Sequence, residues 1–347
     1  MKYKKLPGTD VDVSAICLGT MNFGQQVNEP DAHEQLDYAV SQGVNFIDTA
    51  EIYPIPPERH LQGLTETYLG NWLTRQNRSE LIVASKVASS PFIASREYVG
   101  ERSVYDKKNI LRAIDDSLVR LKTDYVDLYQ VHWPERATNF FGVRGVEDQD
   151  LNQTTSIEET LDALGEVVRS GKARHIGVSN ETPWGVMEYL RLAREKNLPK
   201  IVTIQNQYSL TNRTFEIGLS EICLKENIGL LPYSCTNGGV LSGKYLGGAK
   251  PTGARFTLTE RNKQRYNGDH VQTATERYVG IAKKYGLDPV QMALAFVNDR
   301  AFVSATIIGA TNMEQLKADI ATIDMELPSE VMADIQQLYK EMPDPSC

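Results

Sequence analysis

Short apolar runs alternate with longer amphipathic stretches along this chain. Each run is bounded by turn-forming or polar residues, as is typical of strands buried on both faces. Most of the intervening stretches carry apolar residues at i, i+3, i+4 and i+7, which predicts amphipathic helices. A strand followed by a helix, repeated, predicts parallel strands joined by right-handed crossovers. The runs span residues 14–20, 44–50, 81–87, 127–133, 174–180, 201–206, 229–235 and 304–310.

Several of the amphipathic stretches have helix-capping residues at their ends. Ser156 and Glu159 resemble a capping box, and Gly43 and Gly171 suit C-terminal caps. Two helical segments lie between the seventh and eighth runs, so one of them is an addition to the basic repeat. The predicted helices cover residues 31–43, 64–76, 107–122, 156–172, 182–197, 271–286, 288–299 and 328–341.

This alternation places the chain in the α/β class and predicts a (β/α)8 TIM barrel with additional helices in its C-terminal half. The opening segment alternates around a Pro-Gly-Thr-Asp turn and predicts a β-hairpin able to plug the bottom of the barrel. Long polar segments, residues 88–106, 134–155 and 236–270, follow the third, fourth and seventh strands, on the side where such barrels carry active-site loops. No linker or low-complexity segment interrupts the pattern, which indicates one domain over residues 1–347.

Composition narrows the possible partners. The chain is 41% hydrophobic and 24% charged, as in an ordinary globular protein, and its formal net charge of −8 argues against nucleic acid or an anionic membrane as a partner. Its four cysteines have no disulfide-like or zinc-like spacing, so no metal site is expected. The N-terminal segment has no apolar signal core and no run is long enough to span a membrane, which favours a cytoplasmic location.

Polar residues occur where the apolar runs end, and a parallel barrel brings all those ends to one rim. Lys86 lies near the end of the third run, where a buried charge needs a partner, and Asp48 near the end of the second run is the obvious one. An ammonium near Tyr53 would lower the pKa of that phenol and make it a proton donor or acceptor near neutral pH. His132 lies near the end of the fourth run. Each of these four residues alone would more often be explained by an ion pair or by packing. Together, near the ends of successive strands, they favour a catalytic site.

The motifs GTMNFG, FIDTAEIY, ASKV, VHWP, GVSN and IIGATNMEQL, in this order, resemble those of the aldo-keto reductase superfamily. The resemblance covers about residues 3–347. It implies a TIM barrel that binds NADP(H) without a Rossmann domain and reduces aldehydes or ketones. It also implies a catalytic tetrad of Asp48, Tyr53, Lys86 and His132, with Tyr53 as the general acid.

The same resemblance implies where the dinucleotide would bind. Ser179, Asn180 and Gln205 match positions that hold the nicotinamide carboxamide, and Tyr233 matches the aromatic residue stacked on its ring. The remaining cofactor candidates lie at the rim, in the loop after the seventh strand, or near the adenosine: Gly19, Thr20, Met21, Asp48, Ser234, Cys235, Thr236, Asn237, Gly238, Lys244, Arg255, Gly309, Thr311, Gln315 and Asp319.

The adenosine end departs from the family pattern. Gln315 stands where some members have an arginine, and Ala318 and Asp319 stand where glutamate and asparagine are frequent. Arg255 is a candidate for the missing positive charge beside a 2′-phosphate. NADP(H) is therefore the expected cofactor, and NAD(H) stays open.

The substrate side and two other functions remain as alternatives. Tyr53, His132 and Trp133 are expected to face a small carbonyl substrate, with Met21, Phe140 and Phe141 as further candidates for an apolar wall. A nucleotide-sensing regulatory protein, like the potassium-channel β subunits that share this scaffold, is the second hypothesis. A Schiff-base aldolase using Lys86 is the third, and Asp48 disfavours it by keeping the amine protonated. The sequence does not indicate an oligomeric state.

Overall fold

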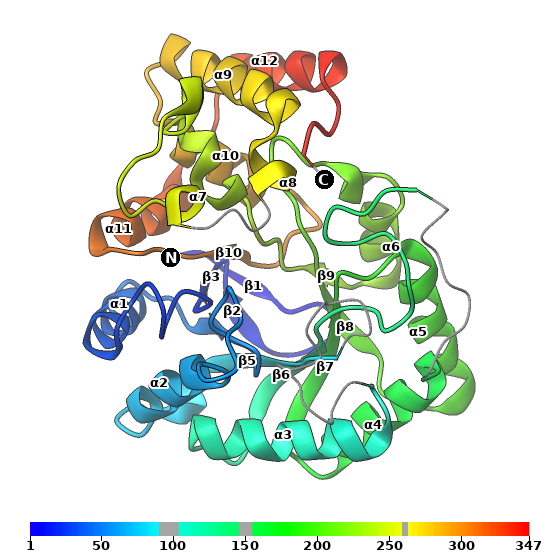
Figure 1. The fold of residues 1–347 in the computed structure, drawn as a ribbon. Coiled ribbons are helices and arrows are strands. Elements are labelled where there is room, and N and C mark those ends of the chain that lie inside the picture. Colours follow the sequence, from blue (N-terminus) through cyan, green and yellow to red (C-terminus); the bar gives the residue numbers. More distant parts are fainter. Residues whose placement is uncertain (90–103, 146–154, 259–262, 347) are drawn as a thin grey trace.

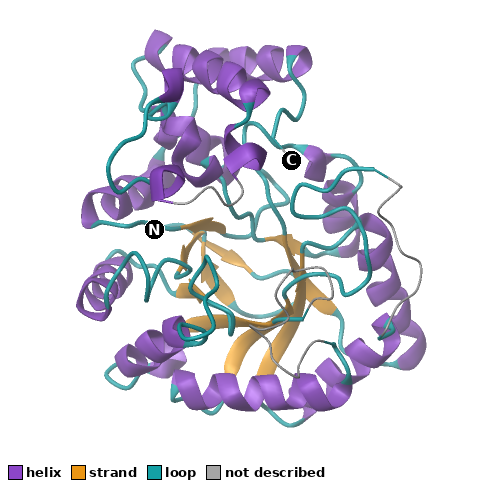
Figure 2. Cartoon of the chain, viewed as in Figure 1, coloured by secondary structure: helices purple, strands orange, loops and turns teal. Residues whose placement is uncertain are grey.

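Eight parallel strands form one continuous sheet that curls around the middle of the molecule (Figure 2). The computed structural model describes residues 1–89, 104–145, 155–258 and 263–346. The order across the sheet follows the chain, with the last strand beside the first, as the repeated strand–helix pattern predicts. The strands are β10 (Thr306–Ile308), β3 (Ile16–Gly19), β4 (Phe46–Asp48), β5 (Ile82–Val87), β6 (Val126–Val131), β7 (Ala173–Ser179), β8 (Ile201–Gln205) and β9 (Gly229–Leu230).

Backbone hydrogen bonds between the segments of β9 and β10 close this sheet into a ring. The amide of Leu230 donates to the carbonyl of Phe302 at 2.9 Å, and the amide of Ser304 donates back to Leu230 at 2.9 Å. Ile307 then donates to Pro232 at 3.1 Å. Strand β9 is shorter than the predicted run because Pro232 has no amide hydrogen to continue the ladder. The predicted (β/α)8 barrel is confirmed.

A hairpin of β1 (Tyr3–Lys5) and β2 (Asp12–Ser14) precedes the barrel. Its buried residues Leu6 and Val13 pack in one cluster with side chains from the starts of the barrel strands, among them Phe46, Ile82 and Leu128. The hairpin therefore fills the N-terminal end of the barrel, as predicted. This plug leaves the opposite end, where the strands terminate, as the open face.

Helices surround the sheet (Figure 1). Ser156 caps one of them by accepting from the amide of Glu159 at 3.1 Å, and Gly43 and Gly171 follow helix ends with φ of 84° and 75°, as their predicted capping roles require. The ring consists of α1 (Glu29–Ser41), α2 (Leu64–Leu73), α3 (Lys107–Leu121), α4 (Ile157–Arg169), α5 (Pro183–Lys196), α6 (Leu219–Glu226), α10 (Pro289–Asn298) and α11 (Met313–Ala321).

In the described part of the chain, four further helices lie outside the basic repeat. The short helices α7 (Arg255–Leu258) and α8 (Lys263–Asn267) belong to the long segment after β9, and α9 (Asp269–Lys284) packs against α12 (Ser329–Glu341) beside the barrel (Figure 1). The predicted additional helices in the C-terminal half are therefore present. Of the three long polar segments, parts of the first two and residues 259–262 of the third lie outside the described residues.

Three cysteines, Cys17, Cys223 and Cys235, are buried free thiols. None of the described helices combines the length and apolar character needed to cross a lipid bilayer. Across the described ranges, no group of three or more His, Cys, Asp or Glu side chains is arranged to hold a metal ion.

Candidate active site

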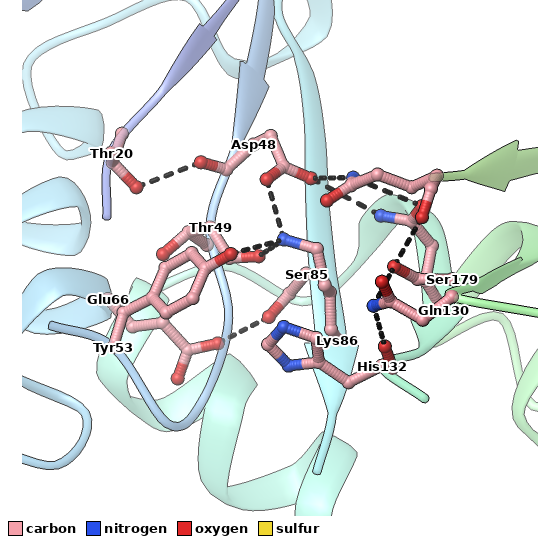
Figure 3. A network of polar contacts seen from close by, with 12 residues as sticks. Thr20, Asp48, Thr49, Tyr53, Glu66, Ser85, Lys86, Gln130, His132 and Ser179 are labelled. Carbon is pink, nitrogen blue, oxygen red and sulfur yellow. Dashed lines mark hydrogen bonds and ion pairs between the residues drawn. The ribbon is translucent and has the colours of Figure 1, made fainter. Parts of the chain in front are cut away.

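Lys86 lies at the centre of a buried polar cluster at the C-terminal ends of the strands (Figure 3). Its ammonium donates to Asp48 Oδ2 at 2.6 Å, to the carbonyl of Thr49 at 2.9 Å and to the hydroxyl of Tyr53 at 3.2 Å. Asp48 is the last residue of β4, and Lys86 is the penultimate residue of β5. The fold thus brings together three of the four residues that the sequence singled out for catalysis.

Burial and the neighbouring charges have opposite effects on the pKa values of Lys86 and Tyr53 in this cluster. Burial opposes the charge on Lys86, but the Asp48 carboxylate and the hydrogen bonds around the ammonium raise its pKa above the ordinary value. The amine therefore stays protonated, which argues against a Schiff-base role. Burial raises the pKa of Tyr53 more than the neighbouring ammonium lowers it, and Asp48 adds to the increase. The predicted net lowering of the Tyr53 pKa is wrong for this arrangement, because burial outweighs the effect of the Lys86 ammonium and Asp48 offsets part of that charge.

His132 follows β6 and faces the same cluster. Its ring lies edge-on to Tyr53, with the ring centroids 5.6 Å apart, and no described residue is hydrogen-bonded to its buried Nδ1. Burial, reinforced by the charge on Lys86, lowers the pKa of His132 well below its usual value. The imidazole is therefore neutral at physiological pH and carries a single N–H.

Gln130, which the sequence analysis overlooked, belongs to the same cluster. It is fully buried on β6, and its Nε2 lies 3.3 Å from Asp48 Oδ1. A signal was available, because Gln130 precedes His132 by two residues and so lies on the same face of the strand. Leu128, two residues earlier, is in the barrel interior.

The candidates for the carboxamide site lie at the ends of the next strands. Ser179 donates to the carbonyl of Gln205 at 2.6 Å, and Gln205 Nε2 donates to Asp48 Oδ1 at 2.8 Å. Asn180 donates to the carbonyl of His132 at 2.9 Å and accepts from the Tyr233 hydroxyl at 2.5 Å. One hydrogen-bonded chain therefore connects the tetrad to all four of the predicted residues.

The loop after β9 carries two cations above two glycines. A Cβ on Gly239 would lie 2.9 Å from Lys244 Nζ, and a Cβ on Gly238 would lie 3.3 Å from Arg255 Nη1. Neither cation has a carboxylate partner among the described residues, and Arg255 Nη2 donates to the side-chain oxygen of Asn22 at 3.4 Å. Burial lowers the pKa of both cations, and Arg255 lowers that of Lys244 further.

Backbone conformation in this loop also suits an anion. Ser234, Asn237, Gly238 and Gly239 all have positive φ, which turns successive amides out of a regular helix or strand. Thr236 begins this turn, accepting from the amides of Gly239 and Leu241. Cys235 is buried, and its thiol donates to the carbonyl of Pro232 at 3.5 Å.

Near β10 and α11, the predicted adenosine residues are engaged in local contacts. Gln315 accepts from the amide and the hydroxyl of Thr311 at 3.0 and 3.1 Å, so its oxygen caps the helix start. Gly309 lies beside Gly19, and a Cβ there would be 3.6 Å from the Gly19 carbonyl. Asp319 is buried, and burial with a contribution from Asp288 raises its pKa to about 7.

An apolar wall stands next to Tyr53. Ala50, Ile52, Tyr53, Ala88 and Trp133 form a small buried cluster, and Met21, Phe140 and Phe141 pack against it. The centroid of the Trp133 ring is 4.5 Å from that of the His132 ring and 6.0 Å from that of the Phe141 ring. Thr20, by contrast, is fully buried and donates to the carbonyl of Asp48 at 2.9 Å, so its hydroxyl supports the strand end.

The last described residues pack against this rim. The amide of Ser346 donates to the carbonyl of Thr211 at 3.0 Å, and Arg144 Nη2 donates to the carbonyl of Ser346 at 2.8 Å. The Thr211 hydroxyl in turn accepts from the side-chain amide of Asn237. The tail therefore contacts loops that follow β6 and β8 and, through Thr211, the loop that follows β9.

A closed barrel with a buried Asp–Lys–Tyr cluster and an adjacent histidine at its rim defines a class of enzymes. The sequence matches the aldo/keto reductase family over residues 15–340. The chain belongs to this family and is an NAD(P)H-dependent oxidoreductase.

Individual relatives are similar over nearly the whole chain. The chain is 53% identical to Protein tas of Escherichia coli (strain K12) over 341 residues, 98% of each chain. It is 31% identical to the uncharacterized oxidoreductase YrpG of Bacillus subtilis (strain 168), over 98% of this chain and 96% of the relative. It is 27% identical to norsolorinic acid reductase B of Aspergillus parasiticus, over 98% of this chain and 84% of the relative.

Proposed function

We propose that this protein uses NADPH to reduce aldehydes or ketones to alcohols, with Tyr53 as the general acid. The observation that carries the proposal is the triple contact of Lys86 with Asp48, Thr49 and Tyr53 at the rim of the barrel. The cluster places a protonatable hydroxyl beside a permanent positive charge and next to an apolar wall. The catalytic site lies within a single domain formed by residues 1–347.

The residues present fit a phosphorylated dinucleotide. Lys244 and Arg255 are positive charges with no carboxylate partner in the described part of the chain, next to a loop whose backbone turns at Gly238 and Gly239. Such a combination of amides and cations suits phosphate. Ser179, Asn180, Gln205 and Tyr233 would hold the nicotinamide end. Lys244 and Arg255 would favour the 2′-phosphate of NADPH over the 2′-hydroxyl of NADH.

When bound, the cofactor supplies the hydride that is added to the carbonyl carbon. Tyr53 donates its hydroxyl proton to the carbonyl oxygen as negative charge develops there. The raised pKa of Tyr53 keeps that proton in place at neutral pH, and the Lys86 ammonium stabilises the phenolate that remains. Asp48 holds Lys86 in position and charged.

His132 and the apolar wall orient the substrate. The neutral imidazole donates one hydrogen bond to the carbonyl oxygen without competing with Tyr53 for the proton. Trp133, Phe140 and Phe141 exclude water and favour a flat or apolar substituent on the carbonyl. The reductase and dehydrogenase names of relatives, such as the aryl-alcohol dehydrogenase GME11368 of Pestalotiopsis microspora, agree with this class of substrate.

Turnover of a panel of aldehydes and ketones, followed by the loss of NADPH absorbance, tests the proposal. Tyr53→Phe removes one hydroxyl and should lower kcat at least about a hundredfold, the usual contribution of a general acid. Tyr189→Phe removes a hydroxyl from another buried tyrosine and serves as the matched control. Equal turnover by wild type and Tyr53→Phe would refute the assigned acid. A chain that binds NADPH but turns over no carbonyl would instead fit the regulatory alternative.

Cofactor choice has its own test. Lys244→Ala and Arg255→Ala should each raise the Kd for NADPH about tenfold, as expected for a lost charge-assisted hydrogen bond, and leave that for NADH unchanged. Lys250→Ala, an exposed lysine of the same loop, is the control. Equal effects on NADPH and NADH would show that these cations do not recognise the 2′-phosphate.

A further inference from the structure

Gln130 occupies a central position among the strands that build the site. In the sheet register it lies opposite Lys86 of β5 on one side and opposite Gly177 of β7 on the other. A Cβ on Gly177 would come within 3.3 Å of Gln130 Cγ and 2.2 Å of the Thr203 hydroxyl oxygen. The absence of a side chain at Gly177 therefore leaves space for the Gln130 side chain, which is fully buried.

The Gln130 amide contacts two partners on different strands. Its Nε2 lies 3.3 Å from Asp48 Oδ1, and its Oε1 lies 3.4 Å from Gln205 Nε2. Gln205 Nε2 is also 2.8 Å from Asp48 Oδ1. The three side chains form a triangle, so Gln130 connects the partner of Lys86 to a residue at the end of β8.

The chemistry of the carboxylate fixes the direction of these hydrogen bonds. An ionised carboxylate only accepts, so both amides must present their NH2 groups to Asp48. Gln205 then has one N–H on Asp48 and the other on Gln130, and its NH2 is fully used. No group in the described ranges donates to Gln205 Oε1, so that oxygen is the part of the amide left for a ligand N–H.

We propose that Gln130 is a positioning residue, which holds Gln205 as a hydrogen-bond acceptor for the carboxamide N–H of the dinucleotide and shares the negative charge of Asp48 with Lys86. This inference rests on the proposed dinucleotide-dependent function. It assigns a role to a residue that contacts neither substrate nor cofactor, and it links the proton-donating cluster to the binding of the nicotinamide end.

Two effects follow from losing the Gln130 amide. Gln205 gains freedom to rotate, so binding of the nicotinamide end weakens while binding of the phosphates does not. Asp48 loses one donor, and more of its charge acts on its neighbours; because this carboxylate raises the pKa of Tyr53, that pKa rises further.

Gln130→Met keeps the length of the side chain and removes its hydrogen bonds. Gln35→Met, at a buried glutamine of α1 that is not part of the polar cluster, is the matched control. The first measurement is the Kd for NADPH and for adenosine 2′,5′-bisphosphate, which lacks nicotinamide. Gln130→Met should raise the Kd for NADPH about threefold to tenfold, the effect of one neutral hydrogen bond, and leave the Kd for the bisphosphate unchanged. Gln35→Met should change neither.

The second measurement is the pH dependence of kcat/KM for alcohol oxidation, in which Tyr53 accepts the proton. Gln130→Met should move the apparent pKa of that profile upward, and Gln35→Met should not. A merely structural role of Gln130 would affect both ligands alike and leave the profile in place. Gln130→Leu replaces the methionine variant if circular dichroism shows that the latter does not fold.

The outcomes separate this inference from the function on which it rests. A wild type that neither binds NADPH nor turns over carbonyls refutes the proposed function. A wild type that does both, with NADPH affinity and pH profile unchanged in Gln130→Met, overturns the role of Gln130 alone.

Discussion

Asp319 offers a quantitative test of how burial acts on one carboxyl group. It lies on α11 with 8% of its surface exposed, and no described side chain forms an ion pair with it. Burial first, and Asp288 second, raise its pKa from 3.8 to about 7. The folded state therefore binds a proton at this residue more tightly than the unfolded state does.

The sign of the pH dependence follows. Below about pH 4 the carboxyl group is protonated in both states and costs no stability. As the pH rises toward 7 the unfolded chain ionises first, so the folded state loses stability, and above about pH 7 the full cost is present. A difference of about three pH units corresponds to about 4 kcal/mol, an upper limit because the carboxylate can relax toward solvent.

Asp319→Asn keeps the shape and cannot ionise. We expect the variant to be more stable than wild type by up to about 4 kcal/mol at pH 8, with a gap that narrows as the pH falls to 5. Urea unfolding followed by tryptophan fluorescence at several pH values measures this gap. Asp10→Asn, at an exposed aspartate, should show no such trend. A gap that is equal at pH 5 and pH 8, or a wild type that is the more stable at pH 8, would refute the reasoning.

Three further predictions concern other parts of the molecule. Arg136→Ala leaves the buried Glu181 carboxylate without its bidentate partner and should lower the free energy of unfolding by about 3–5 kcal/mol. Arg191→Ala removes an exposed ion pair and should lower it much less, so similar losses for the two variants in urea unfolding would contradict this. Because the fold lowers the pKa of His132, the wild-type protein should lose up to about 1.4 kcal/mol of stability per pH unit below about pH 6.5 at this residue, and His132→Asn should lose less. Melting temperatures of the two proteins that fall in parallel as the pH falls would contradict this. Gly19→Ala would place a Cβ 2.7 Å from Ile307 Cγ2 and 3.0 Å from the Ile308 carbonyl oxygen, and should lower the free energy of unfolding by about 1–3 kcal/mol. An unchanged melting temperature would show that β10 can shift to make room for the methyl group.

The barrel was predictable from the sequence because its signal is repeated along the chain. Each buried strand reads as an apolar run and each covering helix as an amphipathic stretch, so errors at single boundaries do not alter the class. Asp48 and Lys86 were also readable, since a charge inside an apolar run needs a partner. Their contact at 2.6 Å joins residues on adjacent strands.

Gln130 was readable only through strand alternation, which puts it on the same face as His132, and the sign of the Tyr53 pKa shift was not readable from the sequence. All six residues of β6 are buried, so burial alone does not show that Asp127 and Gln130 lie on opposite faces of the strand. The pKa of Tyr53 is a balance between burial and an ammonium that Asp48 partly neutralises. The sequence identifies both contributions but contains no measure of their relative size.

The tail at Ser346 makes three separate loops depend on one another. Ser346 accepts from Arg144 and donates to Thr211, whose hydroxyl receives the Asn237 amide. Loss of the segment that contains Ser346 would free the Arg144 guanidinium and loosen the turn at Asn237 together, although the barrel strands would stay paired. A change in this one segment would thus alter two sides of the barrel mouth at once.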